Sequence, residues 1–329
     1  MNVLITGGTG FIGSRLALKL LESGACVRVL GQANTEAEAE NKRLIEAQGA
    51  EVVLASVLDR ENLFELAKGI DLVYHLAAAQ HEANVPDQRF WDVNVGGTRN
   101  MLEASLKGGV KRFVHGSTIG VYGSAVDGTI DEQSPLRPEN IYGITKVEGE
   151  KLVRSFQDRL PVVIIRISET YGSGDRRLLK LFKSIKKKVF FMIGSGRNLH
   201  HLIYIDDLIA GLLLAAKVDD AVGQTFVLAG KEALTTNEMV AVIAAEMGVK
   251  PWPFRAPLAL FLLAAIIMEG ALRPFGIQPP LHRRRMDFFK KSFVLSPDLA
   301  ARVLGFTPCH SFSQGVAETA KWYTEMGYL

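Results

Sequence analysis

The chain has 329 residues, of which 48% are hydrophobic, and 38 basic against 35 acidic side chains leave a formal net charge of +3. The apolar fraction excludes a disordered chain, and the small, interspersed charge argues against nucleic acid as a partner. The length suits one large or two modest domains. Two cysteines, Cys26 and Cys309, are too few for a disulfide framework, which predicts a reducing, cytoplasmic location.

Short β-branched runs alternate with amphipathic segments through the first half of the chain, the pattern of a parallel sheet covered by helices. The predicted strands are Asn2–Thr6, Cys26–Leu30, Glu51–Leu54, Leu72–His75, Arg112–His115 and Val162–Arg166. The predicted helices between them are Gly13–Glu22, Glu38–Gln48, Arg60–Ala67, Asn94–Leu106 and Tyr142–Gln157. The sequence therefore predicts an α/β fold, a Rossmann-type doubly wound parallel sheet that binds ligands at the carboxyl ends of its strands.

The alternation ends after Tyr171. A strand at Leu202–Ile205, a helix from Asp206 and a strand at Thr225–Leu228 follow, and the remainder is predicted to be mostly helical. We therefore expect one domain from residues 1–171, to which residues 202–228 return. Residues 172–201 and 229–329 are expected to form a smaller, mostly helical C-terminal substrate domain.

A glycine-rich loop, Thr6-Gly7-Gly8-Thr9-Gly10-Phe11-Ile12-Gly13, directly follows the first strand and opens the first helix. Gly7 allows a tight turn, Gly10 lets the backbone approach a pyrophosphate, and Gly13 lets the helix pack closely on the strand. The free N–H groups at the start of the helix, where Phe11 and Ile12 lie, favour phosphate binding. The loop therefore predicts that the first domain binds a dinucleotide.

The adenosine end of this cofactor site lacks the usual acidic residue. In the Rossmann fold a carboxylate at the end of the second strand binds the ribose diol of NAD. Here that strand ends in Gly31-Gln32, and Arg28 within it is a candidate for the 2′-phosphate of NADP. NAD is the expected cofactor, and NADP stays open.

Tyr142 and Lys146 are spaced i, i+4, which places them on one face of a predicted helix. A phenol with a pKa near ~10 is a weak base at neutral pH, but a neighbouring ammonium group favours its ionised form. Such a pair can take the proton of a secondary alcohol while hydride leaves to a nicotinamide. Ser117-Thr118 follow a predicted strand, so a hydroxyl there can hold the substrate oxygen near Tyr142.

Six short segments form a characteristic combination: TGGTGFIG at 6–13, His75-Leu76-Ala77-Ala78, Asn94-Val95-Gly96-Gly97-Thr98, Tyr142-Gly143-Ile144-Thr145-Lys146, Ile205-Asp206-Asp207 and Leu304-Gly305-Phe306-Thr307-Pro308. Together they resemble the extended short-chain dehydrogenases/reductases, in particular the NAD-dependent epimerase/dehydratase family, over nearly the whole chain. The resemblance implies an NAD(P)-dependent enzyme. It also implies a homodimer formed through the helices at about Asn94–Leu106 and Tyr142–Gln157.

The resemblance assigns roles to single residues. Tyr142 would be the catalytic acid/base, and Lys146 would lower its pKa and bind the nicotinamide ribose. Thr118 would be the third catalytic residue, with Ser117 as the fallback. The implied cofactor contacts are Gly7, Gly10, Phe11, Ile12, Gly13, Gln32, Ser56, Val57, Leu76, Ala77, Ala78, Asn94, Tyr142 and Lys146, with Ser56 standing where the family has an adenine-contacting aspartate.

One departure from the family pattern limits which reactions are expected. Dehydratases of this family carry an Asp-Glu pair directly after the catalytic threonine, whereas this chain has Ile119-Gly120, which has no proton to give. Sugar dehydration is therefore not expected, and alcohol/ketone redox or epimerisation through a transient ketone remains. The segment Glu132–Pro138 resembles an approach loop of sugar-modifying members and favours a nucleotide sugar as substrate. A non-catalytic nucleotide-sensing module is the third interpretation, against which the intact Thr118, Tyr142 and Lys146 argue.

The residues expected to bind the substrate are His81, Ser117, Glu169, Arg197, His200 and Arg284. His200 falls where the sugar epimerases place a diphosphate-binding arginine, and Arg197 lies three positions earlier. Glu169 stands where they usually have asparagine. Arg284 belongs to the cluster Arg283–Arg285, which is either a diphosphate clamp or a solvated basic loop. No metal site is expected, because His200-His201 lacks a third ligand at metal spacing.

The uncharged run Pro257–Met268 is shorter than the about 20 residues that a membrane span requires. We interpret it as a buried helix of the smaller domain. The alternative is an interfacial helix or a lid over a lipid-like substrate, with peripheral membrane contact through residues 258–268. An apolar helix after a Pro/Trp-rich loop also resembles the 3β-hydroxysteroid and sterol dehydrogenases, so a lipid alcohol is the second candidate substrate.

Overall fold

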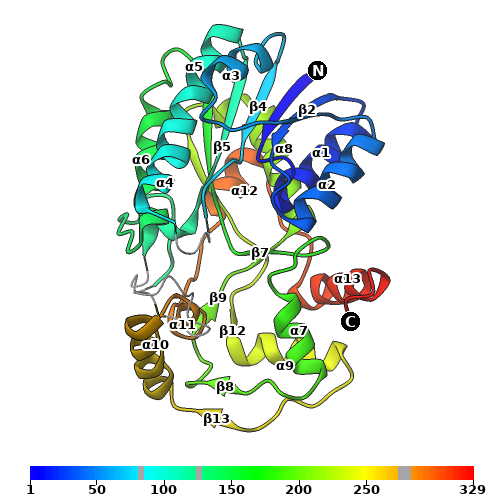
Figure 1. The fold of residues 1–329 in the computed structure, drawn as a ribbon, viewed down its shortest axis with the longest axis vertical. Coiled ribbons are helices and arrows are strands. Elements are labelled where there is room, and N and C mark those ends of the chain that lie inside the picture. The colour runs from blue at the N-terminus through cyan, green and yellow to red at the C-terminus, as the bar shows by residue number, and fades with distance from the viewer. Residues whose placement is uncertain (81–84, 124–127, 273–282) are drawn as a thin grey trace.

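The computed structural model describes residues 1–80, 85–123, 128–272 and 283–329. Its centre is a seven-stranded parallel sheet with the strand order β11-β6-β5-β4-β1-β2-β3 (Figure 1). The strands are β1 (Asn2–Thr6), β2 (Cys26–Gly31), β3 (Glu51–Leu54), β4 (Leu72–His75), β5 (Arg112–Thr118), β6 (Val162–Ile167) and β11 (Thr225–Leu228). The strand order reverses between β1 and β4, which is where dinucleotides bind in such sheets. The predicted Rossmann-type α/β class is confirmed.

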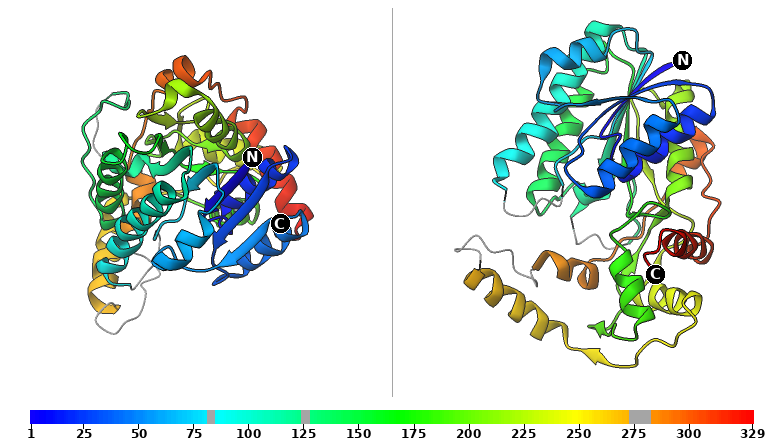
Figure 2. Two further views of the ribbon diagram at one scale, coloured as in Figure 1. Left: turned by 90° about the horizontal axis from the view of Figure 1, so that it is seen from above. Right: turned by 45° about the vertical axis from the view of Figure 1, so that its right-hand side comes forward.

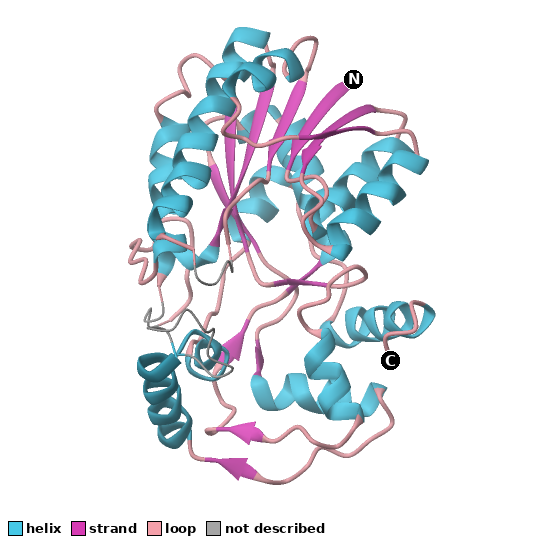
Figure 3. Cartoon of the chain, viewed as in Figure 1, coloured by secondary structure: helices cyan, strands magenta, loops and turns pink. Residues whose placement is uncertain are grey.

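Helices cover both faces of this sheet (Figure 3). One face carries α1 (Phe11–Glu22), α2 (Glu36–Ala47) and α8 (Ile205–Lys217), and the other carries α3 (Arg60–Leu66), α4 (Asp87–Trp91), α5 (Thr98–Gly108) and α6 (Ile141–Arg154) (Figure 1). Side chains of β1 alternate between the two layers: Val3 and Ile5 belong to the same buried cluster as Leu16 of α1, whereas Leu4 packs with Leu63 of α3. A strand covered on both sides must be apolar throughout, which is why β1 reads as a continuous hydrophobic run.

The other elements of the described chain are mostly short. They are η2 (Ile119–Tyr122), β7 (Thr170–Tyr171), α7 (Leu179–Lys186), β8 (Met192–Ile193), β9 (Leu199–His200), β10 (Ile203–Tyr204), η3 (Asp219–Ala221), β12 (Leu234–Thr235), α9 (Thr236–Glu246), β13 (Arg255–Ala256), α10 (Leu258–Leu272), α11 (Arg283–Lys290), α12 (Asp298–Leu304) and α13 (Phe312–Glu325). Most of them lie below the carboxyl ends of the strands, whereas η3 and α12 pack against α8 beside the sheet (Figure 1). The predicted strand Leu202–Ile205 is the shorter β10, which pairs with β7 in a separate two-stranded sheet.

The helix predicted over Asn94–Leu106 consists of two elements. It begins with a π-helical turn, η1 (Asp92–Gly97), and continues as α5 from Thr98. A π turn makes hydrogen bonds one residue longer than an α turn, and such turns are frequent at functional sites. Hydrophobic spacing does not distinguish the two kinds of turn, so the sequence predicted one continuous helix.

The run 258–268 is helical, as α10, but the prediction that it is buried was wrong. Among its side chains only Ala265 and Glu269 are buried, whereas Leu260 is 62% exposed and Ile267 is 60% exposed. The helix lies at the outer edge of the molecule in both further views (Figure 2). Among the described residues, no helix has both the length and the apolarity needed to cross a membrane.

Candidate active site

The glycine-rich loop lies in close contact with the chain segment that follows β4. Gly7 has φ +70°, and a Cβ atom there would lie 2.8 Å from the backbone nitrogen of Ala77. A Cβ atom on Gly13 would lie 2.4 Å from the carbonyl oxygen of Gly7. Both positions therefore require glycine, one for its backbone conformation and one for the close approach of helix and loop. The predicted cofactor residues Gly7, Gly10, Phe11, Ile12 and Gly13 form one turn at the start of α1.

The end of β2, where a carboxylate usually binds the ribose of NAD, carries Gln32 in this chain. The backbone N–H of Gln32 donates to Thr9 Oγ1 at 3.1 Å, and Gln32 Oε1 accepts from Asn34 Nδ2 at 2.8 Å. Arg28 lies in the middle of β2, where Nε donates to Glu51 Oε2 at 2.7 Å and Nη1 donates to the carbonyl of Leu66 at 2.8 Å. Arg28 is therefore occupied by structural partners, which removes the sequence-based candidate for a 2′-phosphate ligand.

Asn94 shapes the segment after β4 that is expected to face the cofactor. Its side-chain amide accepts from the backbone N–H of Ala79 at 2.8 Å and donates to the carbonyl of Ala79 at 3.2 Å and to Thr145 Oγ1 at 3.0 Å. Asn94 is buried. It thus links η1 to α6 and to Ala79, which directly follows Leu76-Ala77-Ala78.

The other two predicted adenosine-side residues follow β3. Ser56 is half-buried, and its hydroxyl accepts from the backbone N–H of Leu58 at 3.1 Å. Val57 is buried and packs against Gly97, at which a Cβ atom would lie 2.5 Å from Val57 Cγ2. Ser56 therefore lies at the carboxyl end of β3, and Val57 closes the turn against η1.

Lys146 lies beneath the carboxyl end of β5 with its charged group out of contact with solvent. The side chain is 2% exposed, and Nζ donates to the carbonyl oxygen of Gly116 at 2.6 Å. Burial lowers the pKa of Lys146 to about 8, while the nearby charge of Glu150 opposes that shift. The ammonium group of Lys146 is therefore held at Gly116, the residue of β5 that directly precedes Ser117.

Tyr142 and Thr118 are brought together by the contact of α6 with η2. Tyr142 is half-buried on the first turn of α6, whose N-cap Asn140 accepts from the backbone N–H of Gly143 at 2.9 Å. A Cβ atom on Gly143 would lie 2.8 Å from the carbonyl oxygen of Gly120. Thr118, two residues before Gly120, is half-buried at the end of β5 and caps η2. The predicted catalytic residues thus share the carboxyl edge of the sheet.

Ser117 belongs to a buried polar network that the sequence did not predict. Its hydroxyl donates to Glu150 Oε1 at 2.6 Å, and Glu150 forms an ion pair with Arg166 in which both side chains are 2% exposed. Arg166 also donates to the hydroxyl of Tyr122 at 2.8 Å and to the carbonyl of Glu132 at 3.0 Å. Since its hydroxyl donates a hydrogen bond to Glu150, Ser117 connects β5 to α6, and Thr118 stays the predicted hydroxyl for a substrate.

Two stacked histidines lie in the sheet beside Lys146, with ring centroids 5.5 Å apart. His75 bonds to Thr6 Oγ1 at 2.8 Å through Nδ1 and to Thr98 Oγ1 at 2.9 Å through Nε2. Burial, and then the charge of Lys146, lower the pKa of His75 to about 3 and hold that of His115 well below its usual range. Both rings are therefore neutral, and neither ring nitrogen of His115 has a hydrogen-bond partner in the described structure.

Glu169 and His200 form a pair at the position expected to bind a diphosphate. His200 is buried, with Nδ1 3.1 Å from Glu169 Oε2 and Nε2 3.1 Å from Thr236 Oγ1. The Glu169 side chain is 43% exposed, two residues beyond β6, the strand that pairs Ile167 with Thr118. A partly exposed carboxylate therefore lies at the edge of the sheet that carries the catalytic residues.

Among the other predicted substrate residues, Arg197 is described and is not brought to this pair. Arg197 is exposed in the turn between β8 and β9, where its backbone N–H donates to Ser195 Oγ at 3.3 Å. Arg284 lies on α11, but its side chain is outside the described part of the chain. His81 also lies outside the described residues.

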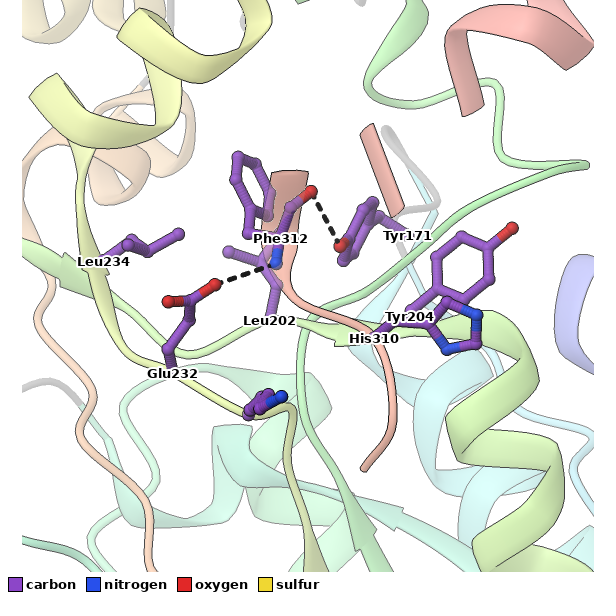
Figure 4. Close-up of a pocket in the computed structure, with 8 residues that line it drawn as sticks. Tyr171, Leu202, Tyr204, Glu232, Leu234, His310 and Phe312 are labelled. Carbon is purple, nitrogen blue, oxygen red and sulfur yellow. Dashed lines mark hydrogen bonds between the residues drawn. The ribbon is translucent and has the colours of Figure 1, made fainter. Parts of the chain in front are cut away.

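A small cavity lies where the segment before α13 crosses β10 (Figure 4). Its lining includes Tyr171, Glu232 and Phe312, and Glu232 Oε1 accepts from the backbone N–H of Phe312 at 2.8 Å. The cavity measures about 10 Å³, which is room for a single water molecule and not for a substrate. Within the described residues no cluster of three or more histidine, cysteine or acidic side chains could hold a metal ion.

Comparison with known proteins agrees with this geometry. The sequence pattern of the NAD dependent epimerase/dehydratase family matches residues 3–229. The chain is 30% identical to a 3 beta-hydroxysteroid dehydrogenase/Delta 5-->4-isomerase of Mycobacterium tuberculosis, covering 99% of this chain and 91% of the relative. It is 27% identical to the N-acetyl-alpha-D-glucosaminyl-diphospho-ditrans,octacis-undecaprenol 4-epimerase of Escherichia coli O157:H7, covering 98% and 95%.

The fold also resembles a solved structure of UDP-glucuronic acid 4-epimerase from Bacillus cereus in complex with NAD. The TM-score is 0.82 at 24% sequence identity, with 99% of each chain covered. The glycine-rich loop lies at the switch point of the sheet and within residues 3–229, which match the sequence pattern of an NAD-dependent family. The chain therefore belongs to the NAD dependent epimerase/dehydratase family and is an NAD-dependent enzyme of the extended short-chain dehydrogenase/reductase type.

Proposed function

We propose that this enzyme oxidises a secondary alcohol to a ketone, either as the product or as the intermediate of an epimerisation. The observation that carries the proposal is the buried Lys146, four residues after Tyr142 on α6, with its ammonium group fixed by the carbonyl of Gly116. An ammonium group on the same helix face favours the phenolate form of Tyr142, which can then accept a proton from an alcohol.

The described residues divide the work as follows. Thr118 donates a hydrogen bond to the substrate oxygen, and Tyr142 takes the hydroxyl proton as the carbon–oxygen double bond forms. NAD, when bound, accepts the hydride from the alcohol carbon. Residues 1–171 and 202–228 hold the cofactor, and residues 172–201 and 229–329 hold the rest of the substrate. In the reverse direction Tyr142 returns the proton to the carbonyl oxygen.

For the substrate we propose an alcohol carried on a lipid, in preference to the nucleotide sugar that the sequence motifs favour. Glu169 presents a carboxylate 3.1 Å from His200, which stands where the sugar epimerases place a diphosphate-binding arginine, and like charges at close range repel each other. His200, which replaces the arginine, is already bonded to Glu169 and Thr236. One relative named above is a 3 beta-hydroxysteroid dehydrogenase, and a steroid is a lipid alcohol without a diphosphate, which supports a lipid substrate. The substrate in the name of the other relative is also borne on a lipid, but it carries a diphosphate that Glu169 would repel.

The reaction is tested with a panel of secondary alcohols, including 3β-hydroxysterols and polyprenol-linked sugars in detergent micelles. NADH absorbance reports net oxidation, and the configuration of the recovered alcohol reports epimerisation. Oxidation by the wild type and its loss by about 10²–10⁴-fold in Tyr142→Phe, which removes only the reacting hydroxyl, is the expected result. NAD affinity should change little in this variant. An unchanged turnover in Tyr142→Phe would overturn the assigned role.

The substrate class is tested separately by thermal unfolding of the NAD-loaded protein with excess UDP. A ligand at ~100 times its dissociation constant adds roughly 2.7 kcal/mol to the free energy of unfolding, which gives a clear rise in Tm. We expect no rise with the wild type. A clear rise in Tm would indicate that the substrate is a nucleotide sugar. Loss of that rise in His200→Ala would place the diphosphate at His200.

A further inference from the structure

One side of α10 presents apolar side chains to the outside of the molecule. Leu260, Leu263, Ile266 and Ile267 are each at least half exposed, and the opposite side of the helix holds the buried Ala265. A helix on the surface of a globular protein normally carries polar or charged side chains on its outer side. We call the four exposed residues the outer face of α10.

A row of aromatic side chains connects α10 to β13, and it begins at Phe261 on the side of the helix that faces the protein. The ring of Phe261 on α10 lies 5.8 Å from that of Phe191, Phe191 lies 5.9 Å from Phe254, and Phe254 lies 6.0 Å from Trp252, measured between ring centroids. Trp252 and Phe254 are both more than half exposed. Amphipathic rings such as tryptophan are favoured at the boundary between lipid and water, where one side of the ring is apolar and the other is wet.

Basic side chains flank this aromatic row. Lys186, Lys187 and Lys188 end α7 and begin the following turn, and Lys188 lines a shallow hollow together with Lys250 and Trp252. All four lysines are exposed, and none forms an ion pair within the part of the chain that is described. The surface therefore combines an apolar face with uncompensated positive charge.

We propose that the outer face of α10, with Trp252 and Phe254, binds the surface of an anionic lipid bilayer. The apolar side chains enter the boundary between head groups and acyl chains, and the four lysines pair with anionic head groups. A second copy of the chain would bring two positively charged surfaces together, whereas an anionic bilayer matches both the charge and the apolar side chains. The helix lies on the bilayer and does not cross it, because 15 residues reach only about 22 Å against a hydrocarbon thickness of about 30 Å.

This surface is independent of the proposed reaction, since none of its residues belongs to the catalytic group. It complements the proposed substrate, because a lipid-borne alcohol partitions into the bilayer that the enzyme would touch. The test therefore measures membrane binding without turnover, so that failure of one proposal leaves the other intact.

The experiment is co-sedimentation of the full chain with vesicles of phosphatidylcholine alone and of phosphatidylcholine mixed with phosphatidylglycerol. We expect binding to the anionic vesicles, weaker binding to phosphatidylcholine, and a decrease with added salt, because salt screens the lysines. The variant Leu263→Glu/Ile267→Glu should lose at least tenfold in vesicle affinity. Lys188→Gln/Lys250→Gln should weaken binding to anionic vesicles and leave binding to phosphatidylcholine unchanged.

Matched controls use the same changes on other parts of the surface. Leu44→Glu/Leu54→Glu places two carboxylates on exposed leucines of α2 and β3, and Lys217→Gln/Lys321→Gln removes two exposed lysines from α8 and α13. Both controls should bind vesicles like the wild type. Absence of wild-type binding to anionic vesicles, or equal losses in control and α10 variants, overturns the proposal. So does a wild-type dimer that Leu263→Glu/Ile267→Glu makes monomeric without any vesicle binding, since the outer face would then join two copies.

Discussion

Arg166 of β6 holds Glu150 of α6 through two hydrogen bonds, Nε to Oε1 at 3.0 Å and Nη2 to Oε2 at 2.8 Å, and both side chains are almost completely buried. Glu150 also accepts from Ser117 of β5, so one carboxylate joins the catalytic helix to two strands. Because Glu150 follows Lys146 by one helical turn, this ion pair fixes the orientation of the helix face that carries Tyr142 and Lys146.

Replacing either partner alone should therefore destabilise the protein strongly. Glu150→Gln leaves the Arg166 guanidinium buried without a counter-charge, and Arg166→Met leaves the buried carboxylate with only the longer contact from Arg154 Nη2 at 3.5 Å. We expect each to lower the free energy of unfolding by about 3–5 kcal/mol in urea denaturation. The double variant Glu150→Gln/Arg166→Met, which removes both charges of this ion pair, should lose much less than the sum. Losses that simply add would show that the two residues act independently.

The buried ammonium of Lys146 should make stability depend on pH. Burial lowers its pKa to about 8 in the folded protein, against about 10.4 in an unfolded chain. Between these values the unfolded chain binds more protons, so this group makes the free energy of unfolding rise as the pH increases from about 8 to about 10.4. The cost of burying the charge is fully present below about pH 8 and disappears across that window, in total roughly 3 kcal/mol.

The measurement is the free energy of unfolding of the NAD-free protein, wild type minus Lys146→Met, as a function of pH. Methionine keeps the length of the side chain and cannot titrate. The difference should rise between pH 8 and 10.4, and a flat difference would contradict a lowered Lys146 pKa.

Gly7→Ala should abolish tight NAD binding. Gly7 has φ +70°, and the added Cβ would lie 2.8 Å from the backbone nitrogen of Ala77. Gly24→Ala is the matched control, because Gly24 has φ +80° but no atom within 4 Å of the added Cβ. Both variants bear the strain of a left-handed residue, about 1 kcal/mol. In calorimetric titration only Gly7→Ala should lose NAD affinity, by at least about tenfold, which is about 1.4 kcal/mol. Equal affinity losses would mean that the strain alone is responsible.

Replacing His75 or His115 by phenylalanine should change the free energy of unfolding in opposite directions. His115→Phe removes two buried ring nitrogens that lack partners in the described structure, and we expect it to raise the free energy of unfolding by about 1 kcal/mol. His75→Phe removes hydrogen bonds to Thr6 and Thr98 and should lower it by about 1–3 kcal/mol. Urea denaturation of the two variants provides the comparison. A loss of stability in His115→Phe would indicate that the imidazole nitrogens have a partner, such as a bound water.

Hydrophobic patterning was enough to predict the sheet, because β1 and its neighbours are covered on both sides and are therefore apolar throughout. The positions of Thr118 and Tyr142 were also predictable, since the end of a strand and the start of a helix meet at one edge of a parallel sheet. The expected homodimer and the roles of the site residues stay predictions.

The buried network was not predicted, because its members lie far apart in the sequence: Arg166 is 16 residues from Glu150 and 44 from Tyr122. A signal was present, since an arginine within the apolar strand Val162–Ile167 requires a buried partner. The burial of α10 was predicted wrongly for a related reason. An apolar run shows that a segment gains free energy by leaving water, and it does not show which surface covers it.

The order of β6 and β11 in the sheet has a consequence for how the chain is made. During synthesis the ribosome releases β6 well before β11, because the whole segment from β7 to η3 lies between them. Until residue 228 emerges, β6 has no neighbour on one side, and an uncovered strand edge invites pairing with other chains. Chaperones that bind nascent chains should therefore associate longest with intermediates that end between residues 168 and 224.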